Sequence, residues 1–116
     1  MIRIIIEGRA ETMYATLCKK TREQQIAGKT TSEEIQLLRS LNEKLAILQN
    51  NAFYGDNIAK RKIPQTYNVQ NLWRVELAHF WRMLYTIKGN EKETICFIID
   101  IVDHQAYDKK FKYRGK

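Results

Sequence analysis

Several residue types and patterns are scarce in this 116-residue chain. It holds one proline, two cysteines and two histidines, and no apolar run approaches the roughly 18–20 residues that a membrane-spanning helix needs. The N-terminal run "MIRIIIEGRAE" is too short for the hydrophobic region of a signal peptide. We therefore expect a cytoplasmic protein with one domain over residues 1–116, one hydrophobic core and no membrane partner.

Motifs of metal and nucleotide chemistry are also missing. The chain has no glycine-rich phosphate loop, no HExxH and no G-x-S-x-G. Cys18 and Cys96 lie far apart, without the CxxC or Cys/His spacing of a metal site. We expect two free thiols, one on a helix and one in a strand, and the sequence predicts neither a metal nor a cofactor.

Acidic residues are too few to balance the basic ones, and the imbalance is uneven. The formal net charge is +7; residues 1–56 hold 8 Lys/Arg and 7 Asp/Glu, whereas residues 57–116 hold 12 and 6. A one-sided positive field attracts polyanions, of which nucleic acid is the commonest. The alternative is a basic surface that only keeps the protein soluble.

The first half of the chain predicts a strand followed by two helices. Residues 2–7 are rich in β-branched side chains, which indicates a short buried strand. Apolar residues at helical spacing follow over residues 9–27. A second amphipathic helix begins near Thr31, which fits a capping box with Glu34, and ends near residues 50–51.

The second predicted helix carries an apolar stripe. Its members lie three or four residues apart and are Ile35, Leu38, Leu41, Leu45 and Leu48. The stripe fits either the core of an antiparallel helical hairpin or a coiled-coil seam that would make a homodimer. About two and a half heptads is short for a coiled coil, which favours core packing.

The second half predicts three strands, over residues 72–78, 80–88 and 94–102, after a connector that contains the turn-forming Pro64. The predicted fold class is therefore α+β, with the order β-α-α-β-β-β. In this fold the helical hairpin packs on one face of a small, antiparallel-dominated sheet. We expect the other face to stay partly open and the C-terminal tail to form a short helix or coil.

Two arginines are predicted to lie on that open face. Side chains alternate across a strand, so Arg74 points away from its apolar neighbours Trp73 and Val75, and Arg82 is placed in the same way on the next strand. A guanidinium group offers a fixed fork of donors that matches two phosphate oxygens. The alternative is that each arginine forms a surface ion pair, for example with Glu76.

Other candidates lie on either side of these strands. Lys60, Arg61 and Lys62 form a basic run that is either a solvated loop or the edge of the same face. His104 follows the last strand and either transfers protons near neutral pH or donates a structural hydrogen bond. Tyr107 offers a ring that stacks on a base and a phenolic proton.

The segments "NLWRVEL", "WRMLYTI" and "IIDIVDHQAYDKKFKYR", with "FYGDNIAKRKIP" ahead of them, resemble the RelE/ParE superfamily of toxins from type II toxin–antitoxin systems. The resemblance is closest to RelE-like chains of archaeal type and covers residues 53–113 well. It implies a single RelE-like toxin domain and the activity of RelE-type members, which are metal-independent endoribonucleases that cut mRNA on the ribosome. ParE-type members share the fold and inhibit DNA gyrase. A gyrase inhibitor or a non-catalytic, basic nucleic-acid-binding homologue is therefore the alternative.

The resemblance also implies roles for individual residues. Arg74 would hold the phosphate, and Arg82 matches an arginine whose role is catalytic or structural. His104 would act as acid or base, and Tyr107 as proton donor or base stacker. RNA contacts are implied for Lys60, Arg61, Lys62, Lys109 and Lys110. The implied partners are mRNA, the ribosome and a small cognate antitoxin that covers the basic face.

Overall fold

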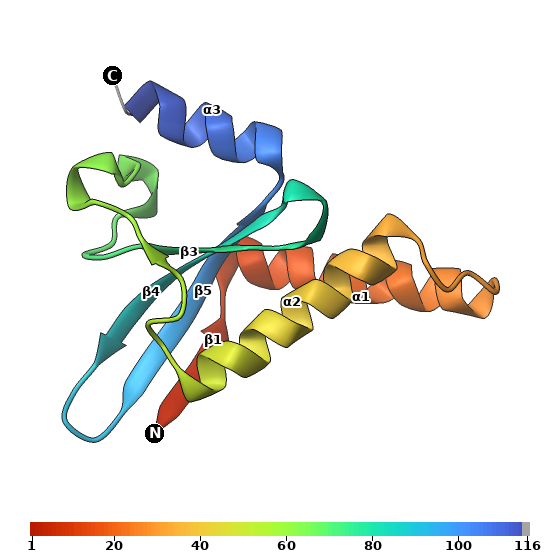
Figure 1. Cartoon of the computed structure of the whole chain (residues 1–116), viewed down its shortest axis with the longest axis horizontal. Coiled ribbons are helices and arrows are strands. Elements are labelled where there is room, and N and C mark those ends of the chain that lie inside the picture. Colours follow the sequence, from red (N-terminus) through yellow and green to blue (C-terminus); the bar gives the residue numbers. More distant parts are fainter. Residues whose placement is uncertain (115–116) are drawn as a thin grey trace.

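Five strands form one mixed sheet in the computed structural model, which describes residues 1–114 (Figure 1). The strands are β1 (Ile2–Ile6), β2 (Asp56–Asn57), β3 (Trp73–Glu76), β4 (Arg82–Gly89) and β5 (Thr94–Val102). Their order across the sheet is β1-β5-β4-β3-β2. β1 is parallel to β5, and the other neighbours are antiparallel. The predicted α+β class is confirmed, and the short strand β2 is an addition to the predicted order.

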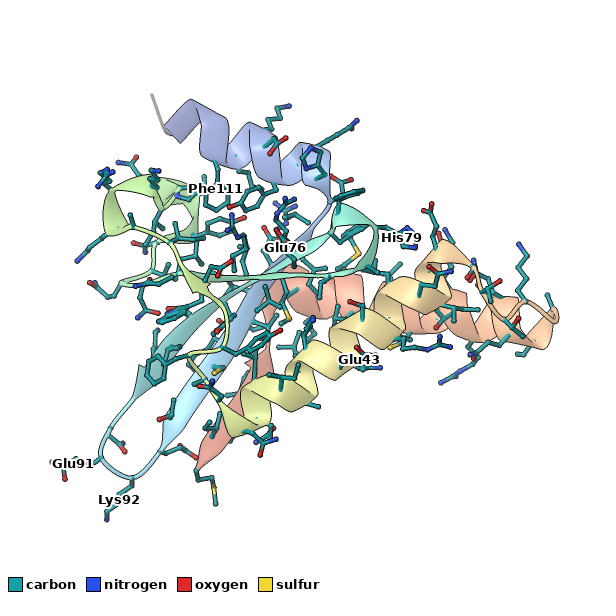
Figure 2. All side chains as sticks on the ribbon, in the orientation of Figure 1. Glu43, Glu76, His79, Glu91, Lys92 and Phe111 are labelled. Atoms are coloured by element: carbon teal, nitrogen blue, oxygen red, sulfur yellow. The ribbon has the colours of Figure 1, made fainter. Side chains whose placement is uncertain are left out.

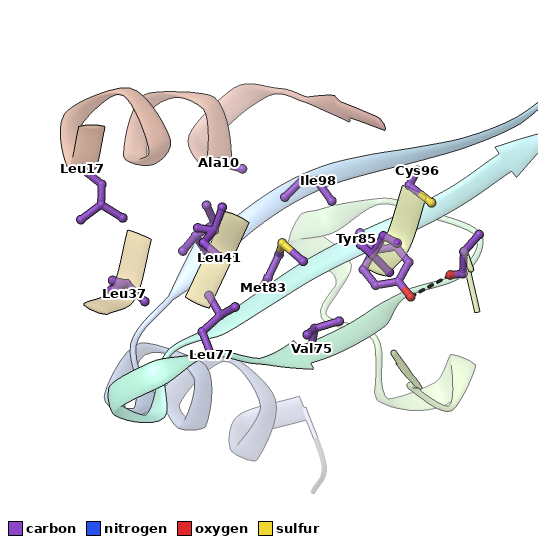
Figure 3. Close-up of a cluster of buried hydrophobic side chains, with 13 residues drawn as sticks. Ala10, Leu17, Leu37, Leu41, Val75, Leu77, Met83, Tyr85, Cys96 and Ile98 are labelled. Atoms are coloured by element: carbon purple, nitrogen blue, oxygen red, sulfur yellow. Dashed lines mark hydrogen bonds between the residues drawn. The ribbon is translucent and has the colours of Figure 1, made fainter. Parts of the chain in front are cut away.

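The helical hairpin covers one face of the sheet, as predicted. It consists of α1 (Gly8–Ile26) and α2 (Glu33–Asn50). Figure 3 shows the core that the hairpin makes with the sheet, in which Leu41 of α2 lies near Met83 of β4. In this core Tyr85 is fully buried and its hydroxyl donates to the Ala52 carbonyl (2.8 Å). None of the helices in residues 1–114 is both long and apolar enough to span a membrane.

The start of α2 differs from the prediction by one residue. Ser32 is the N-cap, and its hydroxyl accepts a hydrogen bond from the backbone N–H of Ile35 (3.1 Å). The predicted capping box of Thr31 and Glu34 is therefore wrong. The Glu34 carboxylate instead accepts from the Gln24 side chain of α1 (2.9 Å) and joins the two helices.

The C-terminal tail is a helix, and it covers part of the face that was expected to stay partly open. α3 (His104–Arg114) lies on the side of the sheet away from the hairpin (Figure 1). Its side chains Tyr107 and Phe111 join a second apolar cluster with Leu72, Leu84 and Val102 of the sheet region. Figure 2 shows Phe111 between α3 and the connector. The second face is therefore a small core with a site at its edge, and only part of it is open.

The link between β3 and β4 is longer than predicted, and β4 begins at Arg82. Residues Ala78–Phe80 form a 3₁₀ turn in which His79 and Phe80 have positive φ angles of 57° and 63°. The turn is attached to α2, because the backbone N–H of Ala78 donates to the Ser40 hydroxyl (3.0 Å) and the His79 ring is hydrogen-bonded to Gln36 (2.8 Å). Figure 2 shows His79 beside the hairpin.

Both cysteines are free thiols, as predicted. Cys18 lies in α1 and is half-buried, whereas Cys96 lies in β5 and is fully buried. Burial raises the pKa of the Cys96 thiol, because an apolar environment disfavours the thiolate. Cys96 is therefore a packing residue of the core.

Candidate functional site

Arg74 of β3 lies on the α3 side of the sheet and makes two side-chain hydrogen bonds. One terminal nitrogen donates to the Tyr107 hydroxyl (2.9 Å) and the other to the Asp56 carboxylate (3.2 Å). β2 places Asp56 directly opposite Arg74 in the sheet register. The preceding residue is Gly55, where an added Cβ would lie 2.8 Å from the Arg74 carbonyl oxygen. The lack of a side chain at position 55 therefore lets the connector come close enough to bring Asp56 to Arg74.

The charge of Arg74 is stabilised by these contacts. Partial burial is the largest single influence and opposes the charge. The hydrogen bonds and charge interactions with Tyr107 and Asp56 together outweigh it, so the pKa of Arg74 is raised above its ordinary value. Arg74 is therefore a permanent cation at the edge of this face.

Tyr107 connects the two arginines. The Arg82 guanidinium lies 4.5 Å from the centre of the Tyr107 ring, and the Phe111 ring stacks on Tyr107 at 4.2 Å with an interplanar angle of 20°. The two groups are too large to share one face of the ring, so Tyr107 lies between them. Both ring faces are therefore occupied, and the Tyr107 hydroxyl accepts the hydrogen bond from Arg74.

His104 begins α3 and faces Arg82. Its Nδ1 lies 3.4 Å from a terminal nitrogen of Arg82, and its Nε2 lies 3.1 Å from the Asp108 carboxylate. Because a guanidinium only donates hydrogen bonds, Nδ1 is the acceptor and Nε2 carries the proton that points to Asp108. His104 is therefore oriented by one group on β4 and one on α3.

A hollow of about 540 Å³ opens beside Arg74 and Tyr107. Lys62 adds a second cation to its lining, and the carboxylates of Asp56 and Asp108 face it as well. Arg82 and His104 are not among its lining residues. They adjoin it through Tyr107 and Asp108, which contact them directly.

The structure brings the four predicted catalytic residues together but divides the predicted basic residues. Arg74, Arg82, His104 and Tyr107 form one contiguous set of contacts. Of the basic residues, Lys62 lines the same hollow, and Lys60 lines a different one beside Pro64. Lys110 lies over the Tyr67 ring, 5.5 Å from its centre. Arg61 and Lys109 are exposed.

The two carboxylates of the site were not predicted. Asp108 lies four residues after His104, which is the spacing of neighbours on a helix, but the tail was predicted as either a helix or a coil and the pair was not drawn from it. Asp56 lies in a two-residue strand whose pairing with β3 leaves no pattern in the sequence. For Arg74 the alternative of a surface ion pair is confirmed, with Asp56 as the partner in place of Glu76.

Two buried donors of the site lack partners. The Nε atoms of Arg74 and Arg82 are buried and make no hydrogen bond in the described part of the chain. Such groups are rare in folded proteins, because each one costs roughly 1–3 kcal/mol. Within residues 1–114 no group of three or more His, Cys, Asp or Glu side chains could hold a metal ion.

Comparison of the chain with protein-family models, with curated proteins and with solved structures gives no match. The RelE-like resemblance of residues 53–113 therefore stays a prediction, and the class of this protein has to be inferred from the geometry of the site.

Proposed function

We propose that this protein is a RelE-like toxin that cleaves mRNA presented by the ribosome in the cytoplasm. One observation carries the proposal: two guanidinium groups, an imidazole and a phenol are in contact on one face of the sheet. They come from β3, β4 and α3, which are three separate elements that the fold brings together. This set of groups suits an anionic substrate whose reaction needs proton transfer.

The reaction that fits these groups is attack of a ribose 2′-hydroxyl on the adjacent phosphorus. The new bond joins phosphorus to the 2′-oxygen, and the bond to the 5′-oxygen breaks. A base takes the 2′-proton, and an acid returns a proton to the leaving 5′-oxygen. In this proposal Arg74 and Arg82 stabilise the crowded phosphorane, while His104 and the Tyr107 hydroxyl transfer the protons.

The contacts of Arg74 are compatible with substrate binding. Its pair with Asp56 is a surface ion pair, because 69% of the Asp56 side chain is exposed. Such pairs contribute about 0–1 kcal/mol, so a phosphate can replace the carboxylate at little cost. The unpartnered Nε atoms also support a functional role for the two arginines. A network of side chains that served only stability would be expected to satisfy all its buried donors.

A ParE-like inhibitor or a non-catalytic nucleic-acid-binding protein is the second candidate. The observation that favours it is the place of His104, which lies outside the lining of the hollow that contains Arg74. Under either proposal the protein would need a cognate antitoxin, and an acidic antitoxin segment would suit the basic face.

The test of the proposal is expression in a bacterial host with the transcripts mapped by primer extension. The wild-type protein should arrest growth and cut mRNA within reading frames. Arg74→Ala and His104→Ala should each lower cleavage by about a hundredfold or more, since each removes a group that acts in the transition state. Arg74→Lys keeps the charge but loses the fork and should be intermediate.

The matched control is Lys29→Ala, an exposed cation between α1 and α2 that should leave toxicity unchanged. Circular dichroism must show that all variants are folded. If Arg74→Ala and His104→Ala remain fully toxic with the same cut sites, the proposed site is wrong. Growth arrest with intact transcripts and stalled supercoiling would establish the ParE-like alternative.

A further inference from the structure

We infer that Phe80 is a stacking platform for an unpaired nucleobase of the bound RNA, next to the phosphate held by the arginines. The inference rests on the proposed function and deepens it, because it names the part of the substrate that the aromatic edge of the site would bind. It assigns the substrate class as single-stranded RNA, whose bases are free to leave the helical stack.

Phe80 is the aromatic residue at this site whose ring is free to receive a ligand. Phe80 is 76% exposed, whereas Tyr107 is 9% exposed and lies between Arg82 and Phe111. The predicted stacking role of Tyr107 would require its ring to part from Arg82 or from Phe111. Phe80 can accept a base without any such rearrangement.

The backbone around Phe80 holds its ring outward at an energetic cost. Positive φ angles at two consecutive residues other than glycine are unusual, and a bulky residue such as phenylalanine is rare there. A residue with no role at this position would be expected to be glycine or asparagine. The conformation is fixed by the contacts of Ala78 with Ser40 and of His79 with Gln36 on α2. A platform that is already fixed loses little conformational entropy on binding.

The same turn contacts the proposed catalytic groups directly. The Phe80 carbonyl accepts a hydrogen bond from Arg82 (3.2 Å), and the Phe80 ring lies 6.2 Å from the His104 ring, at an interplanar angle of 58°. A base stacked on Phe80 would therefore bring its own backbone towards Arg82 and His104. An aromatic ring beside cations is the combination that binds single-stranded nucleic acid. If Phe80 instead bound an apolar surface of a protein partner, the neighbouring cations would not be needed.

The test uses short 2′-O-methyl oligoribonucleotides, which cannot be cleaved, with 2-aminopurine at successive positions. Binding of the wild-type protein should quench the probe at one position, because stacking quenches its fluorescence. Phe80→Ala should abolish this quench and weaken binding about tenfold. Phe80→Trp should keep both signals, and Phe80→Leu, which is apolar but lacks a π-face, should behave as Phe80→Ala does.

Phe53→Ala is the matched control. Phe53 is also exposed, and its ring contacts Trp73 of the helix-side core, so the variant removes an exposed phenyl group away from the arginines. It should bind and quench as the wild type does. Thermal melting checks that each variant is folded.

The outcomes for stacking and for catalysis can be told apart. Three outcomes would overturn the inference. Phe80→Ala could bind and quench like the wild type, the wild-type protein could bind without quenching the probe, or it could fail to bind the oligonucleotide. Cut transcripts in cells would still support the proposed function in each of these cases. A wild-type protein that quenches the probe but leaves transcripts intact would support the stacking platform and overturn the nuclease proposal.

Discussion

Tyr85 fixes the backbone that leads into the site through a single hydroxyl group. That hydroxyl donates to the Ala52 carbonyl (2.8 Å; Figure 3). It also accepts from the Gly55 N–H (3.0 Å), which ties the chain after α2 to the middle of the sheet. Asp56, the partner of Arg74, follows at once. One buried phenol therefore controls both stability and the position of a site residue.

Replacing Tyr85 with phenylalanine should destabilise the protein by about 1–3 kcal/mol. The substitution keeps the ring but leaves the Ala52 carbonyl and the Gly55 N–H without their partner. Urea denaturation at neutral pH would measure the change in the free energy of unfolding. An unchanged midpoint would mean that water replaces the hydroxyl and that the tie is not needed.

The same residue predicts a loss of stability at alkaline pH. Burial raises the pKa of Tyr85 to about 12, from 10.0 for an unperturbed tyrosine. Between these values the unfolded chain loses the proton more readily than the folded one. The contribution of Tyr85 to stability is therefore complete below pH 10 and is lost as the pH rises towards 12. The urea midpoint should fall between pH 9 and pH 11.5, and this fall should be smaller for Tyr85→Phe than for the wild type.

α3 differs from the two helices of the hairpin in how it is attached. α2 buries Ile35, Leu37, Leu41 and Leu48. The described residues of α3 reach the second apolar cluster mainly through Tyr107 and Phe111. Few buried contacts imply a low free energy of local opening, which is common in elements that carry binding sites.

Amide hydrogen exchange should therefore be faster in α3 than in α2. Both are α-helices, and we expect the difference to follow their tertiary packing. Tyr107→Ala should speed exchange in α3 further and leave α1 unchanged. Protection in α3 equal to that in α2 would show that the sheet holds this helix more firmly than its contacts suggest.

The sequence predicted those features that depend on local periodicity. The alternation of Trp73 and Val75 with Arg74 placed the arginine on the correct face, because a strand has a period of two residues. The position of Asp56 opposite Arg74 depends on pairing between segments, which no local pattern encodes. The positive φ angle and the exposed ring of Phe80 were not predicted for a similar reason. Contacts with α2, which is distant in the sequence, hold this turn in a backbone conformation that phenylalanine rarely adopts.

Positive charge is distributed unevenly over the whole molecule. The helical hairpin belongs to a half of the chain that is nearly neutral, and the strands and helix of the site belong to the half that carries most of the +7 charge. Such a field should orient an approaching polyanion before any specific contact forms.

RNA binding should therefore weaken steeply with salt, and the slope should report which cations bind phosphate. Lys62→Gln removes a cation that lines the hollow and should lower the slope of log K against log[salt] by about one. Lys29→Gln removes the same charge at the far end of the hairpin and should leave the slope unchanged. Equal slopes for both variants would mean that binding depends on net charge and not on the site.

The order of the site residues along the chain has a consequence for biosynthesis. Arg74 and Arg82 lie on strands that are made before α3, which supplies His104 and Tyr107. A nascent chain, or one cut short by a premature stop before residue 104, would thus have the guanidinium groups without the imidazole and phenol that complete the set. The four groups could therefore meet only after α3 has emerged from the ribosome that makes it.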